Sequence, residues 1–217
     1  MSNKPIHLVQ SVRELSADTF VIRIDKHDFQ ALAGQHVTLG PHQFAINREF
    51  SIYSSPDKPF LEFLIRAPAG SETALALQKA QPGDEVDLAG PYGEFLIKEP
   101  EDHSRRYLFA ATGVGIAPFH SFVTHYPELD YRLIHGIPNL ADRYDHDDYA
   151  AKRYVSCVSR EQGGDFSGRV TAYLLENPAD PESICYICGR SGMIADVYDL
   201  LRNQGIPSDN IFAETFF

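Results

Sequence analysis

Residues 108–118 read LFAATGVGIAP, an apolar run that leads into a glycine-rich loop and ends at Pro118. The apolar run predicts a buried strand, and the residues from Pro118 to Tyr126 predict a helix directly after the loop. Glycines in such a loop let the backbone approach a pyrophosphate, while the free amides and the dipole of the helix favour an anion. The stretch therefore predicts a nucleotide-binding α/β fold. A glycine-bearing turn without a ligand would show the same pattern.

Downstream of this loop, apolar strands alternate with helical segments. Strands are expected over 106–111, 131–135 and 185–188, and helices over 118–126 and 193–203. Such alternation predicts a parallel sheet with crossover helices. This alternation of strands and helices begins after residues 100–104, so we expect a domain over 103–217.

Upstream, from Ile6 to about Phe95, the sequence consists of short alternating or β-branched runs broken by turn residues. Strands are expected over 20–24, 36–39, 50–53, 61–66 and 85–88, and one helix over 72–79. Many short strands at this spacing predict an antiparallel barrel or sandwich, which we assign to residues 1–102.

Composition narrows the functional classes. A net charge of -11 disfavours binding to nucleic acid or to an anionic membrane, and no apolar run is long enough to span a bilayer. The first residues lack a signal-peptide pattern, and the three cysteines are too few to staple a chain of 217 residues or to hold an iron–sulfur cluster. A cytoplasmic protein with reduced thiols is expected. The acidic tract 142–148 is interpreted as a solvated surface, so no metal site is predicted.

The end of the second predicted strand lacks the residue that an ordinary dinucleotide-binding dehydrogenase needs. A carboxylate about 20 positions after the glycine loop holds the ribose hydroxyls in such enzymes, but here the strand ends in His135-Gly136. Together with Pro118 and the β-rich domain placed first, this disfavours a standard NAD dehydrogenase.

In the β-rich half, residues 48–51 read REFS. Alternate residues of a strand project on one face, so Arg48 and Phe50 together suit a flat, phosphorylated ligand. The alternative is an ordinary strand with one salt-bridged arginine.

Taken with six further motifs, this segment resembles the ferredoxin-NADP reductase family, most closely the short bacterial ferredoxin or flavodoxin reductases. The seven motifs, in order, are Arg48-x-Phe50-Ser51, Gly70-Ser71-Glu72-Thr73, Pro82-Gly83-Asp84, the loop from Gly113 to Pro118, Ser159-Arg160-Glu161, Cys188-Gly189, and the terminus Glu214-Thr215-Phe216-Phe217. The resemblance implies a six-stranded antiparallel flavin-binding barrel, followed by a five-stranded parallel NADP(H)-binding domain that is Rossmann-like.

By this resemblance, Arg48 would hold the flavin phosphate, Phe50 would lie against the isoalloxazine and Ser51 would hydrogen-bond near its N5 edge. The family more often has tyrosine in place of Phe50, so somewhat weaker holding of the flavin is expected. The pyrophosphate contacts implied at the start of the barrel's helix favour FAD over FMN, and they fall on Gly70, Ser71 and Thr73.

On the nicotinamide side, the resemblance implies that Thr112 and Cys188 flank the nicotinamide, that Glu214 lies near the flavin edge and that Phe216 stacks on the flavin. Ser51, Cys188 and Glu214 would then be the residues nearest the chemistry. The remaining nucleotide contacts would come from Gly113, Gly115, Pro118, Gly189, Ser159, Arg160 and Arg169. A redox pair of Cys185 and Cys188 is disfavoured, because positions i and i+3 of a strand face opposite sides.

Arginines at 160 and 169 favour the 2'-phosphate of NADPH, whereas Pro138 stands where relatives often offer another arginine, so NADH remains an alternative. A surface pair of Arg160 with Glu161 is the simpler interpretation of that motif. The predicted function is an FAD-dependent reductase that passes hydride from NADPH to flavin and electrons to a ferredoxin or flavodoxin. The alternatives are a free-standing flavin or ferric reductase, the reductase component of an oxygenase, and a non-catalytic nucleotide-binding subunit.

Overall fold

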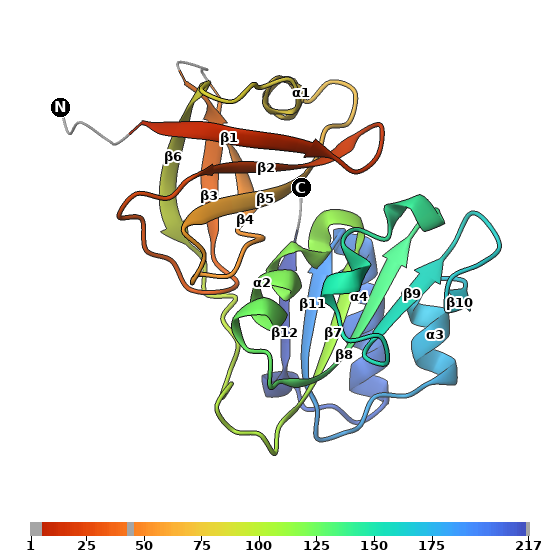
Figure 1. Cartoon of the computed structure of the whole chain (residues 1–217). Coiled ribbons are helices and arrows are strands. Elements are labelled where there is room, and N and C mark those ends of the chain that lie inside the picture. The colour runs from red at the N-terminus through yellow and green to blue at the C-terminus, as the bar shows by residue number, and fades with distance from the viewer. Residues whose placement is uncertain (1–5, 43–45, 216–217) are drawn as a thin grey trace. The chain divides into compact units, whose positions relative to one another are not determined.

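The computed structural model describes residues 6–42 and 46–215, and it divides into two compact units (Figure 1). The first extends to Leu96 and the second begins at Ile97. Among the described residues, no helix combines the length and the apolar character needed to cross a membrane.

The first unit is a six-stranded antiparallel sheet with strand order β4-β3-β6-β1-β2-β5. Past the end of β4, Tyr53 N–H donates to Glu62 O of β5 at 2.8 Å, and Glu62 N–H donates to Ser54 Oγ at 3.1 Å. These contacts join the two edge strands, as the predicted barrel requires. The elements are β1 (His7–Glu14), β2 (Thr19–Asp25), β3 (His36–Pro41), β4 (Arg48–Ser51), β5 (Phe60–Arg66), α1 (Glu72–Gln78) and β6 (Glu85–Tyr92).

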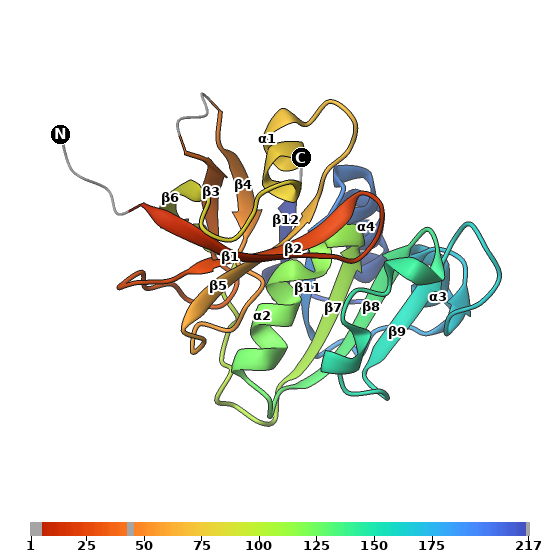
Figure 2. The same cartoon turned by 45° about the horizontal axis from the view of Figure 1, so that its top comes forward.

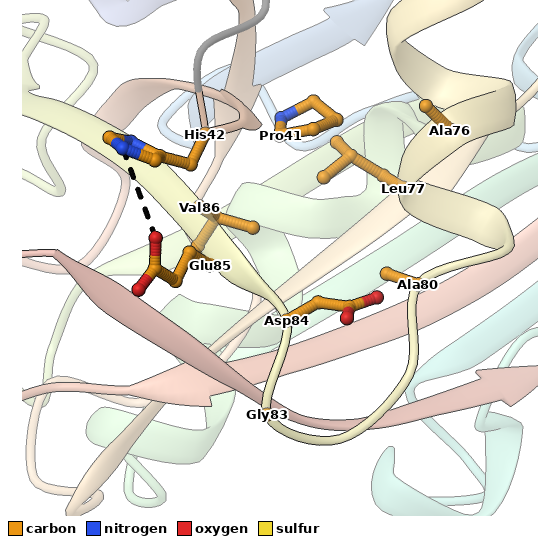
Figure 3. Close-up of a pocket in the computed structure, with 9 residues that line it drawn as sticks. All are labelled: Pro41, His42, Ala76, Leu77, Ala80, Gly83, Asp84, Glu85 and Val86. Carbon is orange, nitrogen blue, oxygen red and sulfur yellow. Dashed lines mark ion pairs between the residues drawn. The ribbon is translucent and has the colours of Figure 1, made fainter.

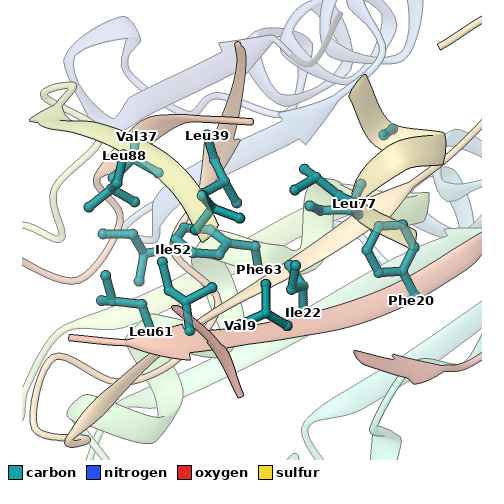
Figure 4. Packing of buried hydrophobic residues seen from close by; sticks show 14 of the residues in the cluster. Val9, Phe20, Ile22, Val37, Leu39, Ile52, Leu61, Phe63, Leu77 and Leu88 are labelled. Carbon is teal, nitrogen blue, oxygen red and sulfur yellow. The ribbon is translucent and has the colours of Figure 1, made fainter. Parts of the chain in front are cut away.

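The barrel is filled by one apolar cluster, to which nearly every strand contributes (Figure 4). On β2, Phe20, Ile22 and Ile24 are all fully buried and lie two residues apart, so they point to the same side of the strand. Leu77 of α1 packs into the same cluster. The period-2 pattern in the sequence therefore corresponds to the inner face of the barrel.

The second unit is a parallel sheet with strand order β10-β9-β8-β7-β11-β12. It has six strands where five were expected, because the two residues of β10 pair in register with Cys157 and Val158 at the end of β9. The strands are β7 (Arg106–Thr112), β8 (Asp130–Ile137), β9 (Tyr154–Val158), β10 (Phe166–Ser167), β11 (Ile184–Gly189) and β12 (Ile211–Thr215). The helices are α2 (Ala117–His125), α3 (Val170–Glu176) and α4 (Ser191–Asn203), with short 3-10 turns η1 (Gly113–Ile116), η2 (Leu140–Asp142), η3 (His146–Asp148) and η4 (Ser208–Asn210).

Helices cover both faces of this sheet (Figure 2). On one face, Leu108 of β7 and Ile187 of β11 share an apolar cluster with residues of α3 and α4. On the other face, Phe109 of β7 stacks on Phe119 of α2, with ring centroids 4.9 Å apart. Both sides of the central strands are therefore buried, which explains why they read as continuous apolar runs.

The segment between β6 and β7 belongs to the second unit from Ile97 onward. Lys98 N–H donates to the Tyr186 hydroxyl at 2.8 Å, and the Tyr107 hydroxyl lies 2.7 Å from Lys98 O and 2.9 Å from Glu99 O. These bonds tie the segment to β7 and β11. They place the division of the chain a few residues before the boundary predicted at residue 102.

Candidate functional site

Three predicted site residues, two expected at the nicotinamide and one near the flavin edge, lie at the carboxyl ends of neighbouring parallel strands. The register pairs Cys188 of β11 with Ala111 of β7 and with Glu214 of β12. Thr112, the last residue of β7, accepts a hydrogen bond at Oγ1 from Arg190 N–H at 3.4 Å. The structure therefore brings Thr112, Cys188 and Glu214 together at the edge of the sheet where ligands of such sheets bind.

The two glycines of the nucleotide loop are needed for different reasons. Gly113 has a φ of +54°, which disfavours other residues, and no heavy atom lies within 4 Å of the position that a Cβ would take. At Gly115, a Cβ would lie 2.5 Å from Cys188 O, inside backbone that cannot move aside. The sequence assigned both glycines to a pyrophosphate. The structure leaves Gly113 open for a ligand and uses Gly115 to pack the loop on β11.

Pro118 lies in the first turn of α2, where a missing N–H costs no helical hydrogen bond. It is buried, so it shapes the helix start from inside the unit.

The Cys188 thiol is fully buried, and burial together with the neighbouring Glu214 raises its pKa well above the ordinary value. It is therefore a neutral S–H group at physiological pH and not a nucleophile. Cys185 lies on the opposite face of β11, in the cluster that includes α3 and α4, where burial raises its pKa to about 12. Both are free thiols, and their opposite orientation is as predicted.

Two exposed arginines follow the ends of β9 and β10. Val158 of β9 pairs with Ser167 of β10 in the parallel sheet. Arg160 lies two residues after Val158, and Arg169 lies two residues after Ser167. Ser159 anchors the first of these ends through Oγ, which donates to Ile137 O at 3.2 Å. Glu161 accepts a hydrogen bond from Leu140 N–H, and within the described residues no ion pair holds either arginine. The surface pair of Arg160 with Glu161 is therefore not seen among the described residues, where Glu161 is engaged by Leu140.

His135 lies beside the candidate site, although the sequence marked its position only by the absence of a carboxylate. The structure places it beneath the nucleotide loop, fully buried and hydrogen-bonded to Gly113. Its position at the end of β8 was the one signal available.

In the first unit, the predicted flavin residues Arg48, Phe50 and Ser51 form the short strand β4. Arg48 is exposed, Phe50 is half-buried against the barrel core and Ser51 is buried. Among the described residues, none forms an ion pair with Arg48, so its guanidinium is available to a phosphate. Arg48 and Phe50 lie on the same side of the strand, as the alternation predicts.

The start of α1 differs in detail from the expectation. Ser71 occupies the N-cap position without a side-chain capping bond, and Gly70 before it is exposed with a φ of +93°. The Thr73 hydroxyl, expected to contact the pyrophosphate, is buried and donates to Ile46 O at 2.8 Å. Thr73 therefore ties the helix to the segment that leads into β4. The remaining prediction for the flavin face, Phe216, lies outside the described residues.

A pocket of about 460 Å³ lies in the first unit between α1 and the turn that precedes β6 (Figure 3). None of its lining residues is a predicted flavin contact. Of its two acidic residues, Asp84 accepts a hydrogen bond from Gln81 N–H at 2.8 Å, and Glu85 lies 3.8 Å from His42, which is also 2.8 Å from Asp87. These polar groups close the turn and pair neighbouring strands, so the pocket does not define the functional site.

A cluster of His7, Asp25 and His27 brings three metal-ligand side chains within 4.8 Å of one another. The Asp25 carboxylate lies 3.1 Å from His7 Nδ1 and 3.2 Å from His27 Nε2, and it accepts from Leu8 N–H at 3.0 Å. These contacts join the start of β1 to the end of β2, and they explain without a metal ion why the three side chains lie together.

An antiparallel barrel and a parallel-sheet unit with this strand-end site define a flavin- and nicotinamide-nucleotide-dependent class of oxidoreductase. Residues 7–97 match the oxidoreductase FAD-binding domain, and residues 109–199 match the oxidoreductase NAD-binding domain. The chain belongs to the ferredoxin-NADP reductase family.

Curated relatives include the toluate 1,2-dioxygenase electron transfer component of Pseudomonas putida, 30% identical over 96% of this chain and 66% of that protein. The propane 2-monooxygenase reductase component of Mycolicibacterium smegmatis is 27% identical over the same shares. The chain thus spans about two thirds of the length of these relatives.

Solved structures share the fold. The cytochrome P450 reductase GcoB of Amycolatopsis superposes with a TM-score of 0.85 at 24% identity, over 98% of this chain and 70% of that one. A ferredoxin NADP+ reductase from Neisseria gonorrhoeae with bound FAD and NADP superposes with a TM-score of 0.84 at 23% identity, over 98% of both chains.

Proposed function

We propose that this chain takes hydride from NADPH onto FAD and passes electrons to a separate redox carrier of the ferredoxin or flavodoxin type. One observation carries the proposal: an FAD-binding unit precedes a nucleotide unit in which Thr112, Cys188 and Glu214 meet beside the open side of Gly113. The three buried free thiols suit a reducing compartment, so we also propose a cytoplasmic location.

FAD supplies the chemistry, because a flavin accepts two electrons as hydride and can release them singly. On the protein side, Arg48 binds a flavin phosphate, Phe50 offers a flat apolar surface and Ser51 hydrogen-bonds the ring edge. The backbone at the exposed Gly70 and the half-buried Ser71 contributes to the pyrophosphate contact. Thr73 acts indirectly, because its bond to Ile46 O fixes the approach to Arg48.

In the nucleotide unit, Thr112 and the neutral Cys188 thiol flank the nicotinamide. A neutral thiol is suited to this role, because a thiolate would stabilise the positive oxidised ring and oppose its release. Gly113, Gly189 and the start of α2 at Pro118 contact the nucleotide backbone, and Glu214 orients the flavin edge. Ser159, Arg160 and Arg169 take the 2'-phosphate of NADPH.

The relatives favour a different electron acceptor, an oxygenase component, because they are themselves electron-transfer or reductase components of oxygenases. A net charge of -11 also opposes docking of an acidic ferredoxin, since like charges slow association. We therefore propose the oxygenase-linked reductase as the alternative to the ferredoxin or flavodoxin reductase.

Anaerobic mixing of the purified protein with NADPH tests the core of the proposal. The protein should be yellow, and NADPH should bleach the flavin absorbance at a rate at least as fast as steady-state turnover. A colourless protein, or a flavin that NADPH and NADH leave oxidised, would indicate a non-catalytic nucleotide-binding subunit. Steady-state rates with a ferredoxin, a flavodoxin, an oxygenase component, free flavin and ferric chelates then identify the acceptor class.

A further inference from the structure

His135 lies near the carboxyl end of β8, two residues before Ile137, and its ring reaches the loop that follows β7. The register pairs Ala111 with His135, so the imidazole comes from the strand beside the one that leads into the loop. Its Nε2 lies 2.9 Å from Gly113 O, and its Nδ1 lies 2.9 Å from the Tyr154 hydroxyl at the start of β9. One buried ring thus joins the nucleotide loop to two strands.

The partners decide which ring nitrogen carries the proton. A carbonyl oxygen only accepts, so Nε2 must donate to Gly113, and in a neutral ring Nδ1 must then accept from Tyr154 O–H. Burial lowers the pKa of His135 to about 4, so the ring is neutral at physiological pH. The other tautomer would set a lone pair of Nε2 against the carbonyl oxygen.

Tyr154 is itself held firmly. Its ring stacks on Tyr149 with centroids 5.3 Å apart, and the Arg143 guanidinium carbon lies 5.9 Å from the centre of the Tyr154 ring. Burial raises the pKa of the Tyr154 hydroxyl, which keeps its proton available for His135. The donor to Nδ1 therefore has a fixed position.

The loop is consequently fixed at both of its glycines. Gly115 packs against the backbone of Cys188, and the Gly113 carbonyl is bonded to His135 on the inner side. The outer side of Gly113 remains open. A loop ordered before the ligand arrives loses less conformational entropy on binding, which increases affinity.

We propose that His135 and Tyr154 form a positioning pair for the nicotinamide nucleotide, in which Nε2–H of His135 holds the Gly113 carbonyl inward and leaves the outer side of the loop to the nucleotide. The inference rests on the proposed function, because it requires a nucleotide at this loop. It also explains the missing carboxylate at this strand end. A carboxylate in place of His135 would oppose the Gly113 carbonyl, since both groups only accept hydrogen bonds.

The test uses the FAD-loaded full-length protein and three variants. His135→Leu removes both hydrogen bonds of the ring, and His135→Gln keeps an N–H group for Gly113. Tyr154→Phe keeps the bond to Gly113 but removes the donor to Nδ1, together with the hydrogen bond between the Tyr154 hydroxyl and Arg143. Tyr107→Phe is the matched control, because it removes a buried tyrosine hydroxyl of the same unit that bonds Lys98 O, away from the loop.

Calorimetry measures the dissociation constants of NADP+ and of adenosine 2',5'-bisphosphate, which carries the 2'-phosphate but lacks the nicotinamide half. We expect His135→Leu to weaken NADP+ binding at least about tenfold, Tyr154→Phe about threefold and His135→Gln no more than about threefold. The bisphosphate and the control should change less than about twofold, and KM for NADPH should rise more than kcat falls. If the wild type prefers NAD+, the ligand pair becomes NAD+ and AMP.

Unchanged NADP+ affinity in His135→Leu overturns the inference while leaving the proposed function intact. Equal losses for NADP+ and the bisphosphate also overturn it, because they indicate general disruption of the unit. If His135→Leu does not fold, Tyr154→Phe decides by the same comparison. A wild-type protein that binds neither nucleotide overturns the proposed function and this inference with it.

Discussion

Arg48 has an exposed guanidinium on the same side of β4 as Phe50, and its removal takes nothing from the barrel core. We expect Arg48→Ala to weaken FAD binding about 10- to 100-fold, because a charge-assisted phosphate bond contributes roughly 1.5–3 kcal/mol. The measurement is flavin absorbance per protein after dialysis, with circular dichroism as the check on folding. Arg66→Ala is the control, since Arg66 pairs with Asp18 at 2.8 Å on the surface of the same unit. Full flavin occupancy in Arg48→Ala would show that the assignment of Arg48 is wrong.

Arg160 is expected to supply much of the preference for NADPH. The wild type should prefer NADPH over NADH by at least about tenfold in kcat/KM, which corresponds to about 1.4 kcal/mol. Arg160→Ala should erase most of this by raising KM for NADPH while leaving NADH unchanged. Lys152→Ala, an exposed cation of the same unit, is the control. Equal kcat/KM for the two nucleotides in the wild type contradicts the assignment.

His135 makes the stability of the nucleotide unit depend on pH. Its pKa falls from 6.5 to about 4 on burial, so its stabilising contribution is complete above pH 6.5 and disappears as the pH falls toward 4. Between pH 7.5 and pH 5, the wild type should lose about 2 kcal/mol of unfolding free energy through this residue. The groups around the ring are Asp142, Tyr144, Tyr154 and, beyond Tyr154, Arg143.

Urea unfolding of wild type and His135→Gln at the two pH values isolates this contribution, because glutamine does not titrate. The wild type should lose about 2 kcal/mol more than the variant. Equal losses would mean that the imidazole is not held neutral in the folded protein.

At the scale of elements, the turn η1 approaches β11 so closely that only glycine fits at position 115. A Cβ there would lie 2.5 Å from Cys188 O and 2.8 Å from the Gly189 Cα, both backbone atoms. We expect Gly115→Ala to displace the loop, to lower the unfolding free energy by about 1–3 kcal/mol and to weaken NADP+ binding. Thermal melting and calorimetry give the two readouts.

Gly192 is the matched control for that substitution. It lies in the first turn of α4, and a Cβ there would meet no atom within 4 Å. Gly192→Ala should therefore be neutral or stabilise by up to about 1 kcal/mol, because alanine favours the helix. A Gly115→Ala protein that melts and binds NADP+ like the wild type contradicts the close packing of the loop on β11.

At the scale of the whole molecule, each unit has its own apolar core. In the proposed function, Arg48 contacts only FAD and the loop at Gly115 serves only the nicotinamide nucleotide. Substitutions at these two positions should therefore leave the other unit's ligand in place. We expect Gly115→Ala to retain FAD as the wild type does, and Arg48→Ala to bind adenosine 2',5'-bisphosphate within about twofold of the wild type. Flavin absorbance and calorimetry on the same two variants check this. Loss of both ligands in either variant would show that the sites are coupled.

The sequence alone determined the class of each unit and the order of the units. Period-2 alternation predicted the antiparallel barrel, and continuous apolar runs with intervening helices predicted the parallel sheet, because each pattern reflects which faces are buried. Ordered motifs such as Arg48-x-Phe50-Ser51 identified the family. The two-residue strand β10 was missed, since so short a pairing leaves no periodic pattern.

The tertiary structure alone decided what individual groups do within the site. The sequence could not show that Thr73 O–H is used by Ile46 O, that Gly115 faces the backbone of Cys188, or that His135 reaches Gly113. Each of these contacts joins residues far apart in the chain, so neither periodicity nor local spacing records it. What the sequence determined follows from burial patterns within each element. What only the structure decided is how the elements meet, because atoms within hydrogen-bond reach are set by packing in three dimensions.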